Sequence, residues 1–192
     1  MFLAVLSCGL TQDWRLFETA HSGLKKNDEH SLVLSDSIYP NHPHCARRDA
    51  WRPRVAEDID EKALAKLRER ADREHVENVE VVLGTADDPH LTAQLDAALI
   101  HNAYHEMSAH ETILARIRES LRPGGRLLIV EPVHESSRGL PRAKQEANHD
   151  IEIGLVEDDL SAAGFEIQQR DVEFVKFKGV AGGFWLLLAR RP

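Results

Sequence analysis

The chain has 192 residues, of which 42% are hydrophobic and 29% charged, and this composition excludes a disordered or fibrous chain. Its 32 acidic and 24 basic side chains give a formal net charge of -8, which argues against a surface built mainly to bind nucleic acid phosphates. No run approaches the roughly 20 apolar residues that a membrane helix needs. Because two cysteines are too few for a disulfide scaffold, we expect a reduced, cytoplasmic protein.

The first 53 residues show no regular alternation of strands and helices. Met1–Leu10 is apolar and similar to a truncated secretion signal that ends at Cys8, but it has no basic start and is too short for a working signal. Export is therefore a minor alternative to a cytoplasmic location. We expect residues 1–53 to form an irregular N-terminal segment and residues 54–192 to form one α/β domain.

The second segment begins with a predicted strand and an amphipathic helix. Val55–Asp58 is a short run that ends in acid, as a strand end does. Asp60 is placed to cap a helix over Glu61–Glu74, where apolar residues recur every three or four positions and the other faces are charged. Val79–Leu83 is rich in β-branched residues and predicts the next strand, which Gly84 ends.

Further strands and helices alternate downstream. The predicted strands are Asp96–Ile100, Arg126–Glu131, Phe165–Phe177 and Phe184–Ala189, and the predicted helices are Ser108–Leu121, capped by Ser108, and Ile151–Ala163. Proline and paired glycines in Arg122–Gly125 predict a tight turn, whereas His134–Asn148 is polar and lacks periodicity. This alternation predicts an α/β fold with a mainly parallel sheet, and the last two strands predict an antiparallel hairpin at one edge.

Polar residues follow several of these strands. A parallel sheet binds ligands beyond the carboxyl ends of its strands, where the strand order reverses. The positions at those ends are Asp58, Gly84–Asp88, Ile100–Glu106 and Glu131–His134. We therefore expect a functional site along this one edge of the sheet.

Three segments at the predicted strand ends share a resemblance to one family. They are Asn78–Gly84, Asn102–Glu106 and Leu121–Glu131, the last reading LRPGGRLLIVE. With them, the chain from about Arg54 to Arg190 resembles the class I S-adenosylmethionine-dependent (SAM-dependent) methyltransferases. The resemblance implies a Rossmann-like methyltransferase sheet, SAM as the cofactor that donates the methyl group, and an acceptor that the sequence does not identify.

The resemblance also implies which residues bind SAM. Asp58, at the end of the second strand, would hold the ribose hydroxyls, because one carboxylate accepts two hydrogen bonds. Ala86 and Asp87 would lie beside the adenine. Asn102 would reach the methionine end of SAM or the acceptor. The plain alternative for Asp58 is a helix cap or a solvated turn acid.

His105 and Glu106 are the candidate catalytic residues. Histidine titrates near neutral pH and could accept a proton from a hydroxyl or amine acceptor. The alternative is that His105 packs under the next helix. Tyr104 could shape the acceptor pocket or serve only as packing.

The glycine-rich turn that follows the first strand of this family is missing. Residues 31–48 contain no glycine; Leu32–Leu34 could imitate the first strand, but two prolines interrupt the helix that should follow. We expect the first strand and its loop to be irregular or absent. One hypothesis is that the N-terminal segment comes from a shifted reading frame or a misassigned start. The alternative function is a non-catalytic remnant that acts as a binding subunit.

No metal site is predicted, because the eleven histidines lack the paired spacings of zinc sites. The histidines weighed for such a site are His42 and His44 (beside Cys45), His101, His105, His110, His134 and His149. Arg138, Arg142 and Lys144 form a small basic cluster that would guide an anionic acceptor or lie in a solvated loop. We expect a small-molecule acceptor, no nucleic acid and no membrane partner, and the oligomeric state is open.

Overall fold

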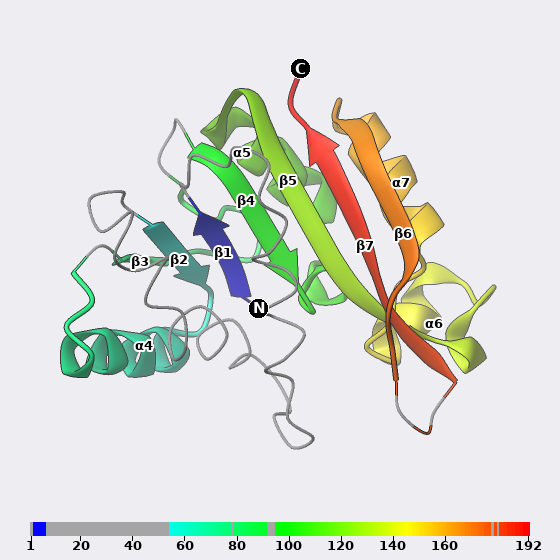
Figure 1. Ribbon diagram of the computed structural model, residues 1–192, viewed down its shortest axis with the longest axis horizontal. Helices are drawn as coiled ribbons and strands as arrows, with labels where there is room; N and C mark the ends of the chain where they lie inside the picture. The colour runs from blue at the N-terminus through cyan, green and yellow to red at the C-terminus, as the bar shows by residue number, and fades with distance from the viewer. Residues whose placement is uncertain (1, 7–53, 78, 92–94, 178, 180) are drawn as a thin grey trace.

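The computed structural model describes residues 2–6, 54–77, 79–91, 95–177, 179 and 181–192. These residues form a seven-stranded sheet in the order β3-β2-β1-β4-β5-β7-β6 (Figure 1). The strands are β1 (Phe2–Leu6), β2 (Arg54–Asp58), β3 (Val79–Leu83), β4 (Leu95–His101), β5 (Leu121–His134), β6 (Glu166–Lys176) and β7 (Gly182–Arg190). The helices are α4 (Glu61–Arg73), α5 (His110–Ser120), α6 (Arg142–Ala147) and α7 (Ile153–Ala162), with single 3-10 turns η1 (Tyr104–Glu106) and η2 (Glu135–Ser137).

The strand directions place four carboxyl ends at one edge of the sheet. β2 pairs in parallel with β3, and β4 pairs in parallel with β5. β1 lies between these two pairs and is antiparallel to both β2 and β4, so β2, β3, β4 and β5 all run in one direction. The edge that the sequence selected for a functional site therefore exists in the fold.

The predicted α/β class and the C-terminal hairpin are confirmed, but the predicted mainly parallel sheet is wrong. β7 is antiparallel to both β5 and β6, and β6 is the outer strand. Of the six neighbouring pairs in the described chain, only β2–β3 and β4–β5 are parallel. The difference arises at the centre of the sheet, where β1 runs against its neighbours.

Strand β1 comes from the apolar start of the chain that we also compared with a truncated signal. Phe2 pairs with Asp58, and Leu3 pairs with both Glu57 and Ile100. Because β1 is reversed, its N-terminal end lies at the edge where β2 and β4 have their carboxyl ends. The alternative first strand at residues 32–34, and the hypothesis of a shifted frame, lie outside the described residues, and the division at residue 53 stays a prediction.

The predicted helix caps are confirmed in part. Asp60 caps α4 as predicted, since its Oδ1 accepts a hydrogen bond of 2.8 Å from the backbone N–H of Lys62. The predicted cap at Ser108 is wrong, because α5 begins at His110 after Ala109 and has no side-chain cap. The turn at residues 122–125 falls within the bounds of β5, at a shift in its register with β4.

The main core lies between the sheet and two helices that cover one of its faces. Figure 1 shows α5 and α7 behind the sheet. Fully buried residues of both helices join the inward side chains of β4, β5 and β7 in one cluster that includes Ile113, Ile117, Val156, Ile129 and Leu187. A smaller cluster on the other face contains Leu99, Leu128, Val130 and Leu186. Residues at both faces of β4 and β5 are thus buried, as the apolar sequence of these strands predicts.

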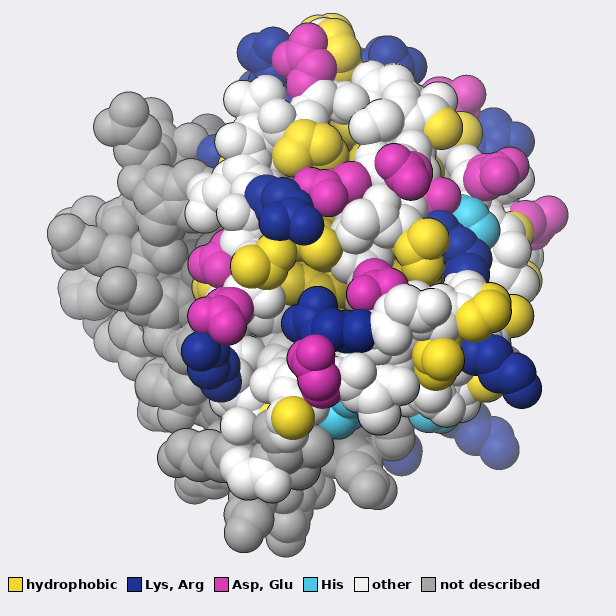
Figure 2. Space-filling model, turned by 90° about the vertical axis from the view of Figure 1, so that its right-hand side faces the viewer, with side chains coloured by type: hydrophobic (Ala, Val, Ile, Leu, Met, Phe, Trp, Pro, Cys, Tyr) yellow, Lys and Arg dark blue, Asp and Glu magenta, His cyan; other side chains and the backbone are white. Residues whose placement is uncertain are grey.

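The described surface is mixed in charge. Figure 2 shows acidic and basic side chains interspersed with small apolar patches on the face that carries the right-hand side of Figure 1. No helix in the described part of the chain is long and apolar enough to cross a bilayer.

Candidate functional site

Two neighbouring acids end strand β2 and point to opposite faces of the sheet. Asp58 is 1% exposed, and its Oδ1 accepts a hydrogen bond of 2.8 Å from the backbone N–H of Asp60. Burial raises the pKa of the Asp58 carboxyl, while the hydrogen bond from Asp60 opposes this effect. The acid of the predicted ribose position is therefore present at the expected strand end, in a site screened from water.

Glu57 has no hydrogen-bond partner within the described part of the chain. Both of its carboxyl oxygens are buried and unpartnered there. Burial raises the pKa of Glu57 to about 8, and the nearby carboxylates of Asp58 and Asp88 add to this effect. Gly84 makes room for the side chain, because a Cβ at Gly84 would lie 2.0 Å from Glu57 Oε1. Sequence analysis did not select Glu57, and it did not predict the burial of this side chain.

The loop after β3 is a hydrogen-bonded polar turn. The Thr85 hydroxyl donates to Asp87 Oδ1 at 2.8 Å and accepts a hydrogen bond from the Asp88 N–H at 3.0 Å. Ala86 and Asp87 are both exposed. The backbone N–H of Gly84 donates to the carbonyl oxygen of Asp58 at 3.1 Å, so the start of this loop is fixed to the end of β2.

Asn102 begins the turn that follows β4. Its φ of 51° lies in the left-handed region that few non-glycine residues adopt. Its backbone N–H donates to the carbonyl oxygen of Val130 at 2.9 Å, which ties the turn to β5. Strand β1 separates β2 from β4. The acids that end β2 and the residues that follow β4 therefore lie on either side of the N-terminal end of β1.

Glu131 organises the rest of that turn from the neighbouring strand β5. Its side chain is fully buried, and Oε1 accepts hydrogen bonds from the backbone N–H groups of Ala103 at 2.6 Å and Tyr104 at 2.8 Å. Its Oε2 lies 2.6 Å from Nδ1 of His105. Because a carboxylate only accepts, Nδ1 of His105 carries a hydrogen, and in the neutral ring Nε2 keeps its lone pair. The sequence placed Glu131 at a strand end, but it did not predict these contacts.

His105 is buried in an acidic environment. Burial lowers the pKa of its imidazole. The hydrogen bond to Glu131 and the charges of Glu131, Glu106 and Asp150 raise this pKa, and together they outweigh burial, so the net shift is upward. Its Nε2 lies 3.9 Å from Oε1 of Glu106. The two predicted catalytic residues are therefore adjacent in space as well as in sequence, one buried and one exposed.

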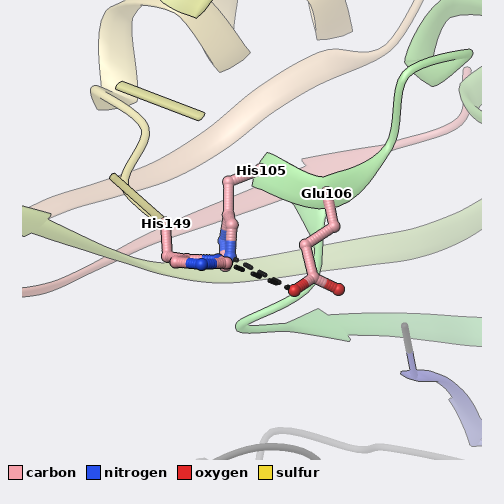
Figure 3. Close-up of side chains that lie close together, drawn as sticks. All are labelled: His105, Glu106 and His149. Carbon is pink, nitrogen blue, oxygen red and sulfur yellow. Dashed lines mark ion pairs between the residues drawn. The ribbon is translucent and has the colours of Figure 1, made fainter. Parts of the chain in front are cut away.

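His149 joins this pair from a distant part of the sequence. It lies in the turn between α6 and α7, and its Nδ1 is 3.8 Å from the same Oε1 of Glu106. Figure 3 shows both imidazoles directed at the Glu106 carboxylate, and the two rings meet edge to face with their centroids 5.6 Å apart. Sequence analysis weighed His149 only as one of many histidines.

Other polar residues weighed in the sequence have structural partners. The Tyr104 hydroxyl donates to Asp159 Oδ2 at 2.8 Å, and Arg142 donates to the same oxygen at 2.5 Å. Arg138 pairs with Glu135 at 2.8 Å. Of the other histidines, His101 stacks on a phenylalanine ring, His110 lies near Asp159 and His134 donates to Asp150. These contacts favour packing and solvated ion pairs for these residues over acceptor binding.

One family model matches part of the chain. Residues 42–129 match the model of a family described as a methyltransferase domain. This segment, a little under half of the 192 residues, is therefore similar to methyltransferase domains. A search of curated protein sequences found no match.

Solved structures show that the fold of this chain is shared with other proteins. A SAM-dependent methyltransferase from Aquifex aeolicus superposes with a TM-score of 0.56 at 18% identity, over 72% of this chain and 67% of that one. The cyclase SpnF gives a TM-score of 0.58 at 20% identity, over 72% and 65%. A SAM-dependent methyltransferase from Methanosarcina mazei gives 0.55 at 13% identity, over 71% and 80%. At these identities the matches show the fold alone, and one of them is named for a different reaction.

Proposed function

We propose that this chain transfers the methyl group of SAM to a small-molecule acceptor at the carboxyl edge of β2, β3 and β4. The observation that carries the proposal is the turn Asn102–Glu106, which Glu131 holds at the same edge as the buried acid Asp58. Two strands thus present polar groups on either side of the sheet's centre, where an α/β sheet of this kind binds its ligands.

The polar side chains at this edge suit the polar parts of SAM. The Asp58 carboxylate would accept from the ribose hydroxyls, and the Asp87 carboxylate from the adenine amine beside Ala86. The Asn102 amide would meet the amino acid end. Asp58 is 1% exposed, so binding requires that its carboxylate become accessible to the ribose.

His105 and Glu106 would act on the acceptor. SAM supplies an electrophilic methyl group when bound. The acceptor's oxygen or nitrogen would bond to the methyl carbon as the carbon–sulfur bond breaks and S-adenosylhomocysteine leaves, and much of the rate gain would come from residues that hold the acceptor in line. His105, oriented by Glu131, would take the acceptor's proton at Nε2. Glu106 is exposed and would contact the acceptor from the same turn.

Ligand binding tests this proposal. SAM and S-adenosylhomocysteine should raise the melting temperature of the protein, because they bind only the folded state. Asp58→Asn, which removes the charge and keeps the shape, should reduce this shift. Asp72→Asn changes an exposed acid on α4 and should leave it unchanged. Absence of any shift at millimolar ligand would contradict the proposal.

A second candidate is a non-catalytic binding subunit with a methyltransferase fold. It is favoured by the burial of Asp58 and by the reversed β1, whose N-terminal end occupies the edge between β2 and β4. The same titration separates the two functions, since a protein of the second kind melts at the same temperature with and without SAM.

A further inference from the structure

Three side chains with metal-ligating atoms meet beside the turn after β4. His105, Glu106 and His149 each offer one ligand atom, and these atoms all lie within 4.8 Å of one another. Oε1 of Glu106 is 3.9 Å from Nε2 of His105 and 3.8 Å from Nδ1 of His149. Figure 3 shows the two rings and the carboxylate converging on one point from two segments of the chain. Ligand atoms bound to one zinc ion at about 2.0–2.2 Å lie roughly 3–4 Å apart, so modest rotation of the two exposed side chains would close the set around an ion.

Glu131 gives His105 the orientation that a metal ligand needs. Metal-binding histidines usually donate their other ring N–H to a carboxylate, which fixes the tautomer and the ring. The hydrogen bond of 2.6 Å between Nδ1 and Glu131 Oε2 is such a contact, and it leaves the lone pair of Nε2 on the side of Glu106. The side chain of His105 is 3% exposed, so this ligand is held before any ion arrives.

His149 is held at this place by a strained backbone and a buried neighbour. Its φ of 56° is in the left-handed region, which residues with a Cβ seldom adopt. The next residue, Asp150, is 1% exposed and accepts hydrogen bonds from Nδ1 of His134 and the hydroxyl of Ser137. The side chain of His149 is 64% exposed, so an ion from solvent can reach it.

We propose that His105, Glu106 and His149 bind a divalent transition-metal ion of the zinc class, with further coordination positions open to an oxygen-donor ligand. Two imidazoles and one carboxylate are a ligand set of zinc and non-haem iron sites. The carboxylates of Glu106, Glu131 and Asp150 all act on His105, so the site is electrostatically suited to a cation. With the ion bound, Nε2 is a ligand, and proton removal by His105 belongs to the metal-free protein. The proposal does not depend on methyl transfer.

The sequence predicted no metal, and the structure explains why. The two histidines come from η1 and from the turn after α6, so their spacing follows none of the paired patterns by which zinc sites are recognised. Only the packing of the α6–α7 turn against the end of β4 brings them together.

Calorimetric titration of the whole chain with zinc tests the site without SAM. After treatment with a chelator and its removal, the wild type should bind one more equivalent of zinc than His149→Ala, and Glu106→Gln should lose the same equivalent or bind it at least tenfold more weakly. His75→Ala is the matched control, because His75 is also exposed and also has a φ of 56°. It should bind as much zinc as the wild type. Magnesium, which prefers oxygen ligands, should show no comparable binding.

Equal zinc stoichiometry and affinity in the wild type, His149→Ala and Glu106→Gln would overturn the proposal, as would a wild type that binds no zinc. Both substituted side chains are exposed, so each variant should fold. Melting curves recorded with chelator check this. Cobalt gives a second readout, because its visible spectrum reports imidazole and carboxylate ligands and should change in His149→Ala but not in His75→Ala. Loss of SAM binding would leave these results unaffected, so the two proposals fail independently.

Discussion

Glu131 acts at the residue scale as the link between two strand ends. One buried carboxylate accepts hydrogen bonds from two backbone N–H groups and from an imidazole, all within the turn after β4. Hydrogen bonds to a charged acceptor are stronger than neutral ones, and their loss leaves buried donors without partners. The geometry of both proposed sites therefore depends on this single side chain.

Removal of Glu131 should destabilise the protein strongly. Glu131→Ala orphans the N–H groups of Ala103 and Tyr104 and leaves His105 without its partner, so we expect a loss of about 3–5 kcal/mol in the free energy of unfolding. Urea denaturation measures this loss. Glu135→Ala removes an exposed acid close in sequence and should cost less than about 1 kcal/mol. Similar losses in both variants would show that the turn does not depend on Glu131.

Glu57 should make stability depend on pH. The folded carboxyl keeps its proton to about pH 8, whereas the ordinary pKa is 4.5, so the folded state binds the extra proton between these values. The free energy of unfolding therefore falls as pH rises through this window, by at most about 1.4 kcal/mol per unit, and the stabilising effect of protonation is gone above it. Urea denaturation of Glu57→Gln should show a flatter profile, because glutamine does not ionise.

The control for this profile is Glu77→Gln, an exposed acid between α4 and β3. It should keep the slope of the wild type. A wild-type slope that persists in Glu57→Gln would mean that other groups cause the pH dependence.

At the element scale, strand β1 connects the two parts of the sheet at its centre. It is the only described element that bridges β2 and β4, and it pairs antiparallel with both. An apolar pentapeptide suits a strand with neighbours on both sides, but its sequence carries no signal for direction. The strand therefore joins the parallel pairs β2–β3 and β4–β5 while it runs antiparallel to both of its neighbours.

Hydrogen exchange tests the place of β1. Amides in Leu3–Val5 that donate to β2 or β4 should exchange orders of magnitude more slowly than free peptide, because both edges of a central strand are paired. The outward amides of the edge strands β3 and β6 provide the internal comparison and should exchange faster. Unprotected amides throughout Phe2–Leu6 would remove β1 from the sheet.

At the scale of the whole molecule, both proposed sites lie along one edge. The carboxyl ends of β2, β3, β4 and β5 meet there. Asp58 ends β2, and the turns after β3 and β4 supply Asp87, Asn102 and His105. The apolar core beneath α5 and α7 stabilises the scaffold that carries this edge. Separation of the packed layer from the polar edge leaves the turns available for binding and chemistry.

Local patterns in the sequence were sufficient for most elements. The apolar period of α4 and its cap at Asp60 depend on residues within one or two turns of helix, and both are found in the fold. The predicted cap at Ser108 is wrong because α5 begins two residues later, at His110, and has no side-chain cap.

The sequence by itself determined the α/β class, the approximate bounds of the helices and strands, and the edge on which polar residues gather, because hydrophobic period and turn residues act over a few neighbouring positions. Only the tertiary structure decided the direction of β1, the burial of Glu57, the contact between Glu131 and His105, and the meeting of His105 with His149. Each of these depends on residues far apart in the chain, and the free energy of such contacts is set by burial and geometry rather than by local sequence.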